Sequence, residues 1–268
     1  MLRAICASGI GMRSTHEDNF LLNGKIMDEK IQKKMPELKI IQYQSVCCKK
    51  VNFIAVSDGM GGHNAGEIAS NYCMKKIAAL EEKAQNCTSL NEVILLIQQE
   101  IVHINNSICE YSEQYPELSG MGTTLIMLVN YESENAILNI GDSRAYSIGE
   151  AGICQISKDH TEGQRMIDLG ILTRKEVESF PAKKNLNRYI GYFGRGYQLQ
   201  ADVFYLFPSE SLILLCSDGV CDIFDEKKML DYFCQDEELY DIAKRIVNDA
   251  CYSKNADNAT LIIIKIKR

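Results

Sequence analysis

Three short apolar segments of this chain each end at an aspartate that is followed by a small residue. The segments read FIAVSDG, AILNIGDSR and LILLCSDG, and their aspartates are Asp58, Asp142 and Asp218. A fourth apolar segment, ATLIIIKI, begins directly after Asp257 and Asn258. One Asp-Gly pair is an ordinary turn signal, but a carboxylate repeated at the ends of strand-length segments constrains the fold. If these ends converge, several carboxylates share one small, partly desolvated space.

The pattern of strands and helices predicts an α+β fold. Strand-length apolar runs cover 51–57, 123–129, 136–140, 211–216 and 260–266, and helical stripes follow residue 65, the capping box Ser89-x-x-Glu92 and residue 239. Strands grouped together and separated from paired helices favour mixed sheets packed against helices over a strictly alternating βαβ chain. We expect the stripe of the first helix to face the core; it consists of Ile68, Tyr72, Ile77 and Leu80.

Composition and charge exclude several classes of protein. The net charge of −7 disfavours a nucleic-acid partner. No apolar run approaches the roughly 18 residues of a membrane span, and the N-terminus turns polar too early for a signal peptide. The 11 cysteines contain no C-x-x-C pair, which argues against zinc and indicates thiols in a reducing cytoplasm. Without repeats or a linker rich in Pro, Gly or Ser, the 268 residues are predicted to form one domain over 1–268.

The aspartates favour one kind of metal chemistry. Aspartate oxygens are hard ligands, and no matching cluster of His or Cys accompanies them in the sequence, so we expect Mg²⁺ or Mn²⁺. Two such ions form a known device for activating water and holding a phosphoryl group. Gly59 allows the backbone to approach a metal closely, since it has no Cβ. The segment does not match the lysine-containing nucleotide-binding loop or G-x-G-x-x-G.

The N-terminal segment GMRSTHEDNF adds further candidates. Taken alone, Arg13, Glu17 and Asp18 are ordinary solvated residues. Considered with the aspartates, Glu17 becomes a further ligand candidate. Arg13 becomes a candidate phosphate clamp, because its guanidinium is always charged and presents a fork of donors.

Eight segments in order make this chain resemble the metal-dependent protein phosphatases of the PPM (type 2C) family, in particular its short bacterial members. Each motif alone is weak, but the ordered set is specific and extends from residue 11 to residue 264. The segments are GMRSTHEDNF, SDGMGGHNAGE, GMGTTLIMLV, NIGDSRAYSI, SKDHT, NRYIG, CSDGVCDIF and ADNATLIII.

The resemblance implies a fold and a set of roles. The fold is a four-layer α-β-β-α sandwich, in which two central mixed or antiparallel sheets are flanked by helix pairs and the metals lie at one end. Two core Mn²⁺ or Mg²⁺ ions are implied, with a third, weaker ion held by Asp142 and Asp218. The remaining implied roles are a bridging ligand for Asp58, a carbonyl ligand for Gly59, ligands for Asp218 and Asp257, an indirect ligand for Glu17, outer positions for Asp18 and Asn258, and phosphate binding for Arg13.

The chain departs from the family pattern at its general acid. The family often has a histidine directly after Asp-Gly, but Met60 stands there and the first histidine is His63. His63 is therefore the candidate acid, with metal-bound water as the rival and a structural role as the alternative. His16 and His160 are expected to be structural. Met121 replaces the commoner serine of the Ser-Gly-Thr-Thr motif, for reasons the sequence does not explain.

Two segments carry their own structural expectations. Residues 160–200 are irregular, with a short capped helix at Thr173-x-x-Glu176 and a loop at NRYIGYFGRG, and we predict a flap there. Residues 24–50 exceed a minimal strand connection and are predicted to form a variable surface hairpin.

The leading hypothesis is metal-dependent hydrolysis of phosphoserine and phosphothreonine in proteins, by a water between two metals that attacks phosphorus in line. The expected partners are phosphorylated proteins, including a Ser/Thr kinase or its targets, with no nucleic acid and no membrane. A covalent phospho-enzyme is not expected, because no cysteine stands in a C-x₅-R segment. The alternatives are a catalytically inactive family member that acts as a scaffold and, less well matched, a metal-dependent nuclease.

Overall fold

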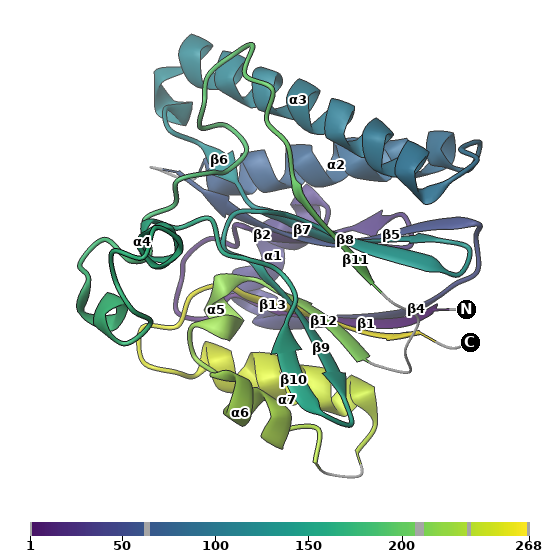
Figure 1. Cartoon of the computed structure of the whole chain (residues 1–268), viewed down its shortest axis with the longest axis vertical. Helices are drawn as coiled ribbons and strands as arrows, with labels where there is room; N and C mark the ends of the chain where they lie inside the picture. Colours follow the sequence, from purple (N-terminus) through teal and green to yellow (C-terminus); the bar gives the residue numbers. More distant parts are fainter. Residues whose placement is uncertain (1, 62–64, 207–211, 235–236, 267–268) are drawn as a thin grey trace.

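The computed structural model describes residues 2–61, 65–206, 212–234 and 237–266. Two β-sheets lie face to face between two layers of helices (Figure 1). Alternating side chains on each strand produce this layering. On β5 (Val51–Met60), Phe53 and Ala55 join the core beneath the helices, whereas Ile54 and Val56 point into the core between the sheets. Strands that are apolar on both faces therefore sit at the centre of a four-layer molecule.

One sheet has six strands in the order β10-β9-β12-β13-β1-β4. Neighbouring strands in it are all paired antiparallel. Its strands are β1 (Leu2–Gly9), β4 (Ile40–Cys47), β9 (Arg144–Gly149), β10 (Gly152–Gln155), β12 (Leu212–Cys216) and β13 (Ala259–Ile266).

The other sheet has seven strands, in the order β11-β8-β7-β5-β2-β3, with β6 paired to β5 beside this path. Its pairings are also all antiparallel, so no parallel pair of a mixed sheet occurs among the described residues. Besides β5, its strands are β2 (Asp18–Leu22), β3 (Lys25–Ile26), β6 (Gly122–Thr123), β7 (Leu125–Tyr131), β8 (Glu134–Ile140) and β11 (Asp202–Leu206).

Helices cover the outer face of each sheet, which confirms the predicted α+β architecture (Figure 1). The long pair α2 (Gly66–Ala84) and α3 (Leu90–Gln114) covers the seven-stranded sheet, and the predicted Ser89 cap accepts from the Glu92 N–H. The six-stranded sheet is covered by α7 (Leu239–Cys251) and two short helices, α5 (Asp218–Cys221) and α6 (Glu226–Asp231). The remaining elements are α1 (Glu29–Leu38), α4 (Glu162–Asp168), η1 (Pro116–Leu118) and η2 (Glu176–Ser179).

Two structural expectations were wrong. Residues 24–50 do not form a surface hairpin: they contain β3, α1 and β4, and β4 pairs with β1 along its length. Met35 of α1 is buried in the core between the sheets, so this segment is part of the fold. Ile68 does not face the core, because 44% of it is exposed. Among the described residues, no helix combines the length and apolar character needed to cross a membrane.

Candidate metal centre

The ends of the strands place the predicted site residues at one edge of the sandwich. Antiparallel registers put Asp18 opposite Asp58, and Gly9 opposite Ala259. In the same way, Cys216 at the end of β12 lies opposite Arg144 at the start of β9. Because Asp142, Asp218 and Asp257 directly adjoin these strand ends, all four aspartates of the apolar segments gather at the same end of the two sheets.

A cavity of about 560 Å³ opens at this edge. Met60, Thr124, Lys184 and Tyr189 also line it, beside the predicted residues. Asp18 lies buried beneath the cavity and does not line it. The predicted residues on its wall are Arg13, Glu17, Asp58, Gly59, Asp142, Asp218, Asp257 and Asn258. His63 lies outside the described residues.

Asp58 lies within β5, which continues to Met60 instead of ending at residue 57 as predicted. Its backbone N–H donates to Thr124 Oγ1 at 2.9 Å. Its carbonyl accepts from the Thr124 N–H and from Thr123 Oγ1, both at 2.9 Å. The two threonines of the segment GMGTTLIMLV, Thr123 and Thr124, therefore hold the main chain of Asp58 in place. These threonines were not among the predicted site residues. Met121 of the same segment is a core residue with 1% exposure, which accounts for an apolar side chain there.

Glycines bring the aspartate-bearing segments into backbone contact. A Cβ on Gly59 would lie 2.0 Å from the carbonyl oxygen of Gly66, at the start of α2, and 2.8 Å from the carbonyl oxygen of Glu17. A Cβ on Gly219 would lie 1.9 Å from the carbonyl oxygen of Asn258. Real side chains do not tolerate such distances, so these positions require glycine for close packing. The reason for Gly59 that the structure supplies is thus backbone packing, whereas its carbonyl as a metal ligand stays a prediction.

Burial and neighbouring negative charges raise the pKa values of the carboxyl groups in the cavity. Burial and the charge of Asp218 raise the pKa of Asp58 well above its usual range, and burial raises the pKa of Asp218 as well. Both carboxyl groups are buried at the same cavity, so keeping both ionised costs free energy unless a cation lies near them. Burial, followed by the charge of Asp218, raises the pKa of Asp142 to about 7. A divalent cation bound here would relieve the repulsion among these carboxylates.

Asp18 supports the site from below. Ser217, the residue before Asp218, donates from Oγ to Asp18 Oδ2 at 2.7 Å. The other oxygen, Oδ1, is buried without a hydrogen-bond partner. Burial raises the pKa of Asp18 to about 7, although hydrogen bonds from Thr260 and Ser217 oppose the shift. An orphaned buried acceptor directly beneath a carboxylate cavity fits a site that holds a cation or its bound water.

Asn258 fastens the N-terminal loop to the site and does more than the local support first expected of it. Its Oδ1 accepts from the Glu17 N–H at 2.7 Å, and its Nδ2 donates to the carbonyls of Ile10 and Thr15 at 2.9 and 3.1 Å. This loop carries Arg13, whose guanidinium forms an ion pair with Asp257 at the cavity. The predicted phosphate clamp is therefore placed beside a predicted ligand.

His160 holds the loop that carries Asp142. Its ring Nδ1 accepts from the backbone N–H of Gly141 at 2.9 Å, and the backbone N–H of His160 donates to the Gly141 carbonyl at 3.0 Å. Ser143, on the other side of Asp142, shares a hydrogen bond of 2.7 Å with Thr124. His16 is also buried, with Nε2 3.1 Å from Ser8 Oγ, and burial lowers its pKa to about 4. Both contacts agree with the structural roles expected of these histidines.

The donor set fits a hard divalent cation. No three His, Cys, Asp or Glu side chains among the described residues already form a closed metal-binding group. Mg²⁺ usually keeps several waters and takes one or two protein carboxylates together with substrate phosphates. An open cavity lined by Asp58, Asp142, Asp218 and Asp257 suits that requirement. It does not suit Zn²⁺, which prefers His and Cys ligands in closed tetrahedra.

Known proteins are similar to this chain both in sequence and in fold. The family model described as Protein phosphatase 2C matches residues 44–242. The serine/threonine phosphatase stp of Listeria welshimeri is 29% identical over 213 residues, which cover 79% of this chain and 83% of that protein. The crystal structure of the serine/threonine phosphatase Stp1 from Staphylococcus aureus is similar with a TM-score of 0.80 and 26% identity, over 100% of this chain and 96% of that one.

A solved structure of the catalytic domain of the serine/threonine protein phosphatase PstP, in complex with two manganese ions, also shares the fold. Its TM-score is 0.75 at 24% identity, over 100% of both chains. The family model spans most of the present chain, and the Listeria and Staphylococcus relatives match it over 83% and 96% of their own lengths. This chain therefore belongs to the protein phosphatase 2C (PPM) family, as a serine/threonine protein phosphatase of the bacterial type.

Proposed function

We propose that this phosphatase hydrolyses phosphoserine and phosphothreonine side chains of proteins with two Mn²⁺ or Mg²⁺ ions held around Asp58. The observation that carries the proposal is the single cavity that Asp58, Asp218 and Asp257 line together with Arg13. Asp58, the Gly59 carbonyl, Asp218 and Asp257 would hold the two ions, with Glu17 acting through water. Asp142 and Asp218 would hold a weaker third ion.

Each group of the chain has a defined task in this mechanism. When bound, the two ions supply Lewis acidity and an activated water at neutral pH. The hydrogen bonds from Thr123 and Thr124 keep Asp58 in place, so the attacking geometry is set before substrate arrives. Arg13 donates to the phosphoryl oxygens and stabilises the charge that spreads over them in the transition state. His63 is the proposed donor of the proton to the leaving alkoxide.

The substrates are proposed to be phosphorylated proteins, among them a Ser/Thr kinase or its targets, and residues 160–200 are proposed to form a flap over the site. The name of the Listeria relative, a serine/threonine phosphatase, supports this substrate class. A catalytically inactive scaffold is the alternative. It is disfavoured because Asp58, Asp218 and Asp257 are all present and converge on one cavity.

The experiment is a phosphatase assay on p-nitrophenyl phosphate and a phosphothreonine peptide, with Mn²⁺, Mg²⁺ or EDTA. We expect metal-dependent release of phosphate from both substrates. In Asp218→Asn, kcat/KM should fall by at least about 100-fold, because one neutral amide replaces a ligand shared by the ions. The same variant in EDTA should be as stable as the wild type or more so, since a buried like charge is removed.

Two results would contradict the proposal. An absence of metal-dependent phosphate release from either substrate would favour the scaffold alternative. Near-normal turnover by Asp218→Asn would show that the ions bind elsewhere. For the general acid, His63→Ala should slow the phosphopeptide more than p-nitrophenyl phosphate, because only the poor leaving group needs the proton. An equal loss on both substrates would remove His63 from that role.

A further inference from the structure

The cavity around Asp58, where the metal ions are proposed to bind, is called the metal cavity below. Among the described residues, two cationic side chains line it, Arg13 and Lys184. Each is paired with a carboxylate: Arg13 with Asp257, and Lys184 with Asp222. Both side chains are largely exposed, at 57% and 64%. They come from separate parts of the chain, the N-terminal loop and the segment between η2 and β11. Only Arg13 was predicted to bind phosphate.

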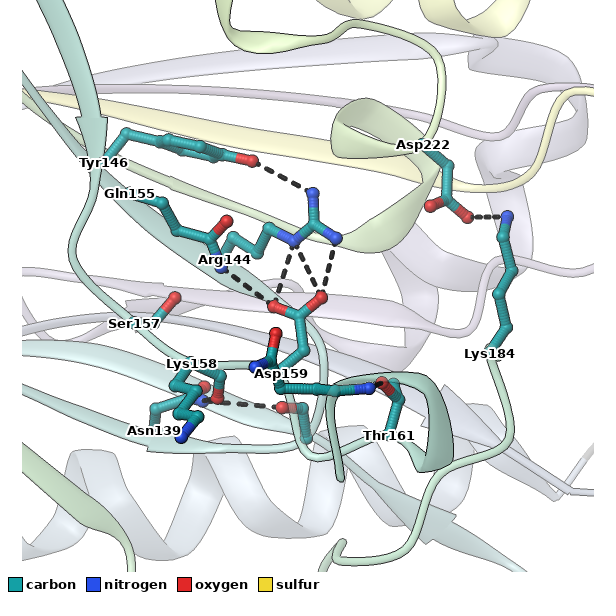
Figure 2. Close-up of polar contacts among 12 residues, drawn as sticks. Asn139, Arg144, Tyr146, Gln155, Ser157, Lys158, Asp159, Thr161, Lys184 and Asp222 are labelled. Atoms are coloured by element: carbon teal, nitrogen blue, oxygen red, sulfur yellow. Dashed lines mark hydrogen bonds and ion pairs between the residues drawn. The ribbon is translucent and has the colours of Figure 1, made fainter. Parts of the chain in front are cut away.

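Lys184 lies where two cavities meet. Beside the metal cavity there is a groove of about 900 Å³, lined by the segment 161–184 and by α5 and α6. Lys184, Asp142 and Asp218 line both hollows. Figure 2 shows the Lys184 side chain extending from its segment to Asp222, which directly follows α5. The ammonium group therefore belongs to a side chain that borders both the groove and the cavity of Asp58.

The Lys184–Asp222 pair is a weak tether. Among the described residues it is the only ion pair or side-chain hydrogen bond between the segment 161–187 and residues 212–266. A single ion pair between an exposed lysine and a partly exposed aspartate stabilises by about 0–1 kcal/mol. The lysine therefore loses little by leaving Asp222 for a stronger anion. A phosphoryl dianion is such an anion, because its charge-assisted hydrogen bonds are short and strong.

The charge of the cavity favours a cation close to the phosphoryl group. The wall of the cavity carries the carboxylates of Glu17, Asp58, Asp142, Asp218 and Asp257, and a phosphoryl group brings two further negative charges. The proposed metal ions would offset the charge of the carboxylates that hold them, and Arg13 forms an ion pair with Asp257. A compact ammonium on a flexible stem supplies another positive charge without a fixed geometry.

We propose that Lys184 is a second phosphate-binding residue: its ammonium group exchanges Asp222 for the phosphoryl group of the substrate and for the phosphate product. The inference rests on the proposed function, in that the phosphoryl group binds in the cavity of Asp58. The neighbouring Lys183 provides a matched control, because it pairs with Glu178 at 2.8 Å and lines the groove but not the metal cavity.

The test compares Lys184→Met, Lys184→Arg, Lys183→Met and Asp222→Asn in the Mn²⁺-loaded protein. For each, KM and kcat on a phosphothreonine peptide and Ki for inorganic phosphate are measured. Lys184→Met should raise KM and Ki together by about 10- to 100-fold, the effect of one lost charged hydrogen bond, with kcat changed less than about 2-fold. Lys184→Arg should keep both near wild type, and Lys183→Met should change neither.

Asp222→Asn separates phosphate binding from mere tethering. If Lys184 binds phosphate, freeing it from Asp222 should leave Ki unchanged or lower it, in contrast to Lys184→Met. If the pair serves only to hold the segment, both variants should raise KM alike and leave Ki unchanged, and the proposal is overturned. Calorimetric titration of inorganic phosphate into the Mn²⁺-loaded protein gives the same comparison without turnover. An inactive wild type would thus contradict the proposed function, whereas unchanged phosphate affinity in Lys184→Met contradicts this inference.

Discussion

The strand ends beneath the metal cavity and the segment 161–187 beside it are held together by different kinds of contact. Beneath the cavity, backbone touches backbone at Gly59 and Gly219, and buried hydrogen bonds hold Asp58 and Asp18. In the adjoining segment, backbone hydrogen bonds join its own two ends, and its ion pairs, such as Lys183–Glu178 and Lys184–Asp222, are exposed. Regular structure there amounts to the short elements α4 and η2.

This difference separates two requirements of a phosphatase. Metal ligands must be placed within a fraction of an ångström, which close-packed backbone provides. The segment 161–187 has few buried side chains, so we expect that its exposed residues can change without moving the aspartates. Substitutions beneath the cavity should therefore cost stability and metal binding together, whereas substitutions in the segment should alter substrate affinity alone.

The largest effect is expected from Gly59→Ala. The added Cβ would lie 2.0 Å from the carbonyl oxygen of Gly66, so β5 and α2 must separate. We expect a loss of more than about 3 kcal/mol in the free energy of unfolding, measured with urea in EDTA, and weaker Mn²⁺ binding. Gly194→Ala is the control, because Gly194 has φ +76 but no atom within 4 Å of an added Cβ, and should cost about 1 kcal/mol. Equal losses would show that backbone contact does not distinguish the two regions.

A smaller effect is expected from Asn258→Ala. The variant leaves the Glu17 N–H and the carbonyls of Ile10 and Thr15 without their partner, at a cost of about 2–3 kcal/mol. Because Arg13 belongs to the freed loop, KM for a phosphopeptide should also rise by about 10-fold. Asn248→Ala is the control, since Asn248 makes only a 3.5 Å side-chain contact with Asp249. A stable variant with normal KM would show that the loop is held by other contacts.

The smallest effect is expected at His160, where the segment joins the strand ends. Burial, and then the charge of Arg188, lowers the pKa of His160, although Asp202 opposes the shift with a contact of 3.1 Å. Below pH 6.5 the unfolded chain binds a proton that the folded protein excludes, so this residue reduces stability as pH falls toward its folded pKa.

The measurement is the change in Tm between pH 7 and pH 5 for wild type and His160→Asn, both in EDTA. Asn retains an acceptor for the Gly141 N–H and has no titrating ring. The decrease in Tm from pH 7 to pH 5 should therefore be smaller in His160→Asn than in the wild type. If other groups make Tm rise over this range, the rise should be larger in the variant. An identical pH dependence of Tm in the two proteins would show that the titration of His160 does not contribute to the stability of the fold.

Much of the fold and of the candidate site could be predicted because it depends on local patterns. Short continuous apolar runs indicate strands, and Ser89 with Glu92 marks a helix start; both appear in the structure. The surface hairpin expected at 24–50 was wrong because β4 is only partly apolar, so its own sequence gives a weak strand signal. It forms a strand because it pairs with β1 at the edge of the six-stranded sheet. The role of His63 stays a prediction.

The sequence by itself determined the family of this protein and the residue types of its site, because the aspartates, Arg13 and the family motifs can be read one residue at a time. Only the tertiary structure decided which residues meet. Gly59 packs on Gly66, Gly219 packs on Asn258, and Lys184 reaches Asp222. Contacts between distant segments leave no local period, since they depend on how closely two backbones approach. Lys184, an ordinary exposed lysine in the sequence, gains its proposed role only from the cavity it lines.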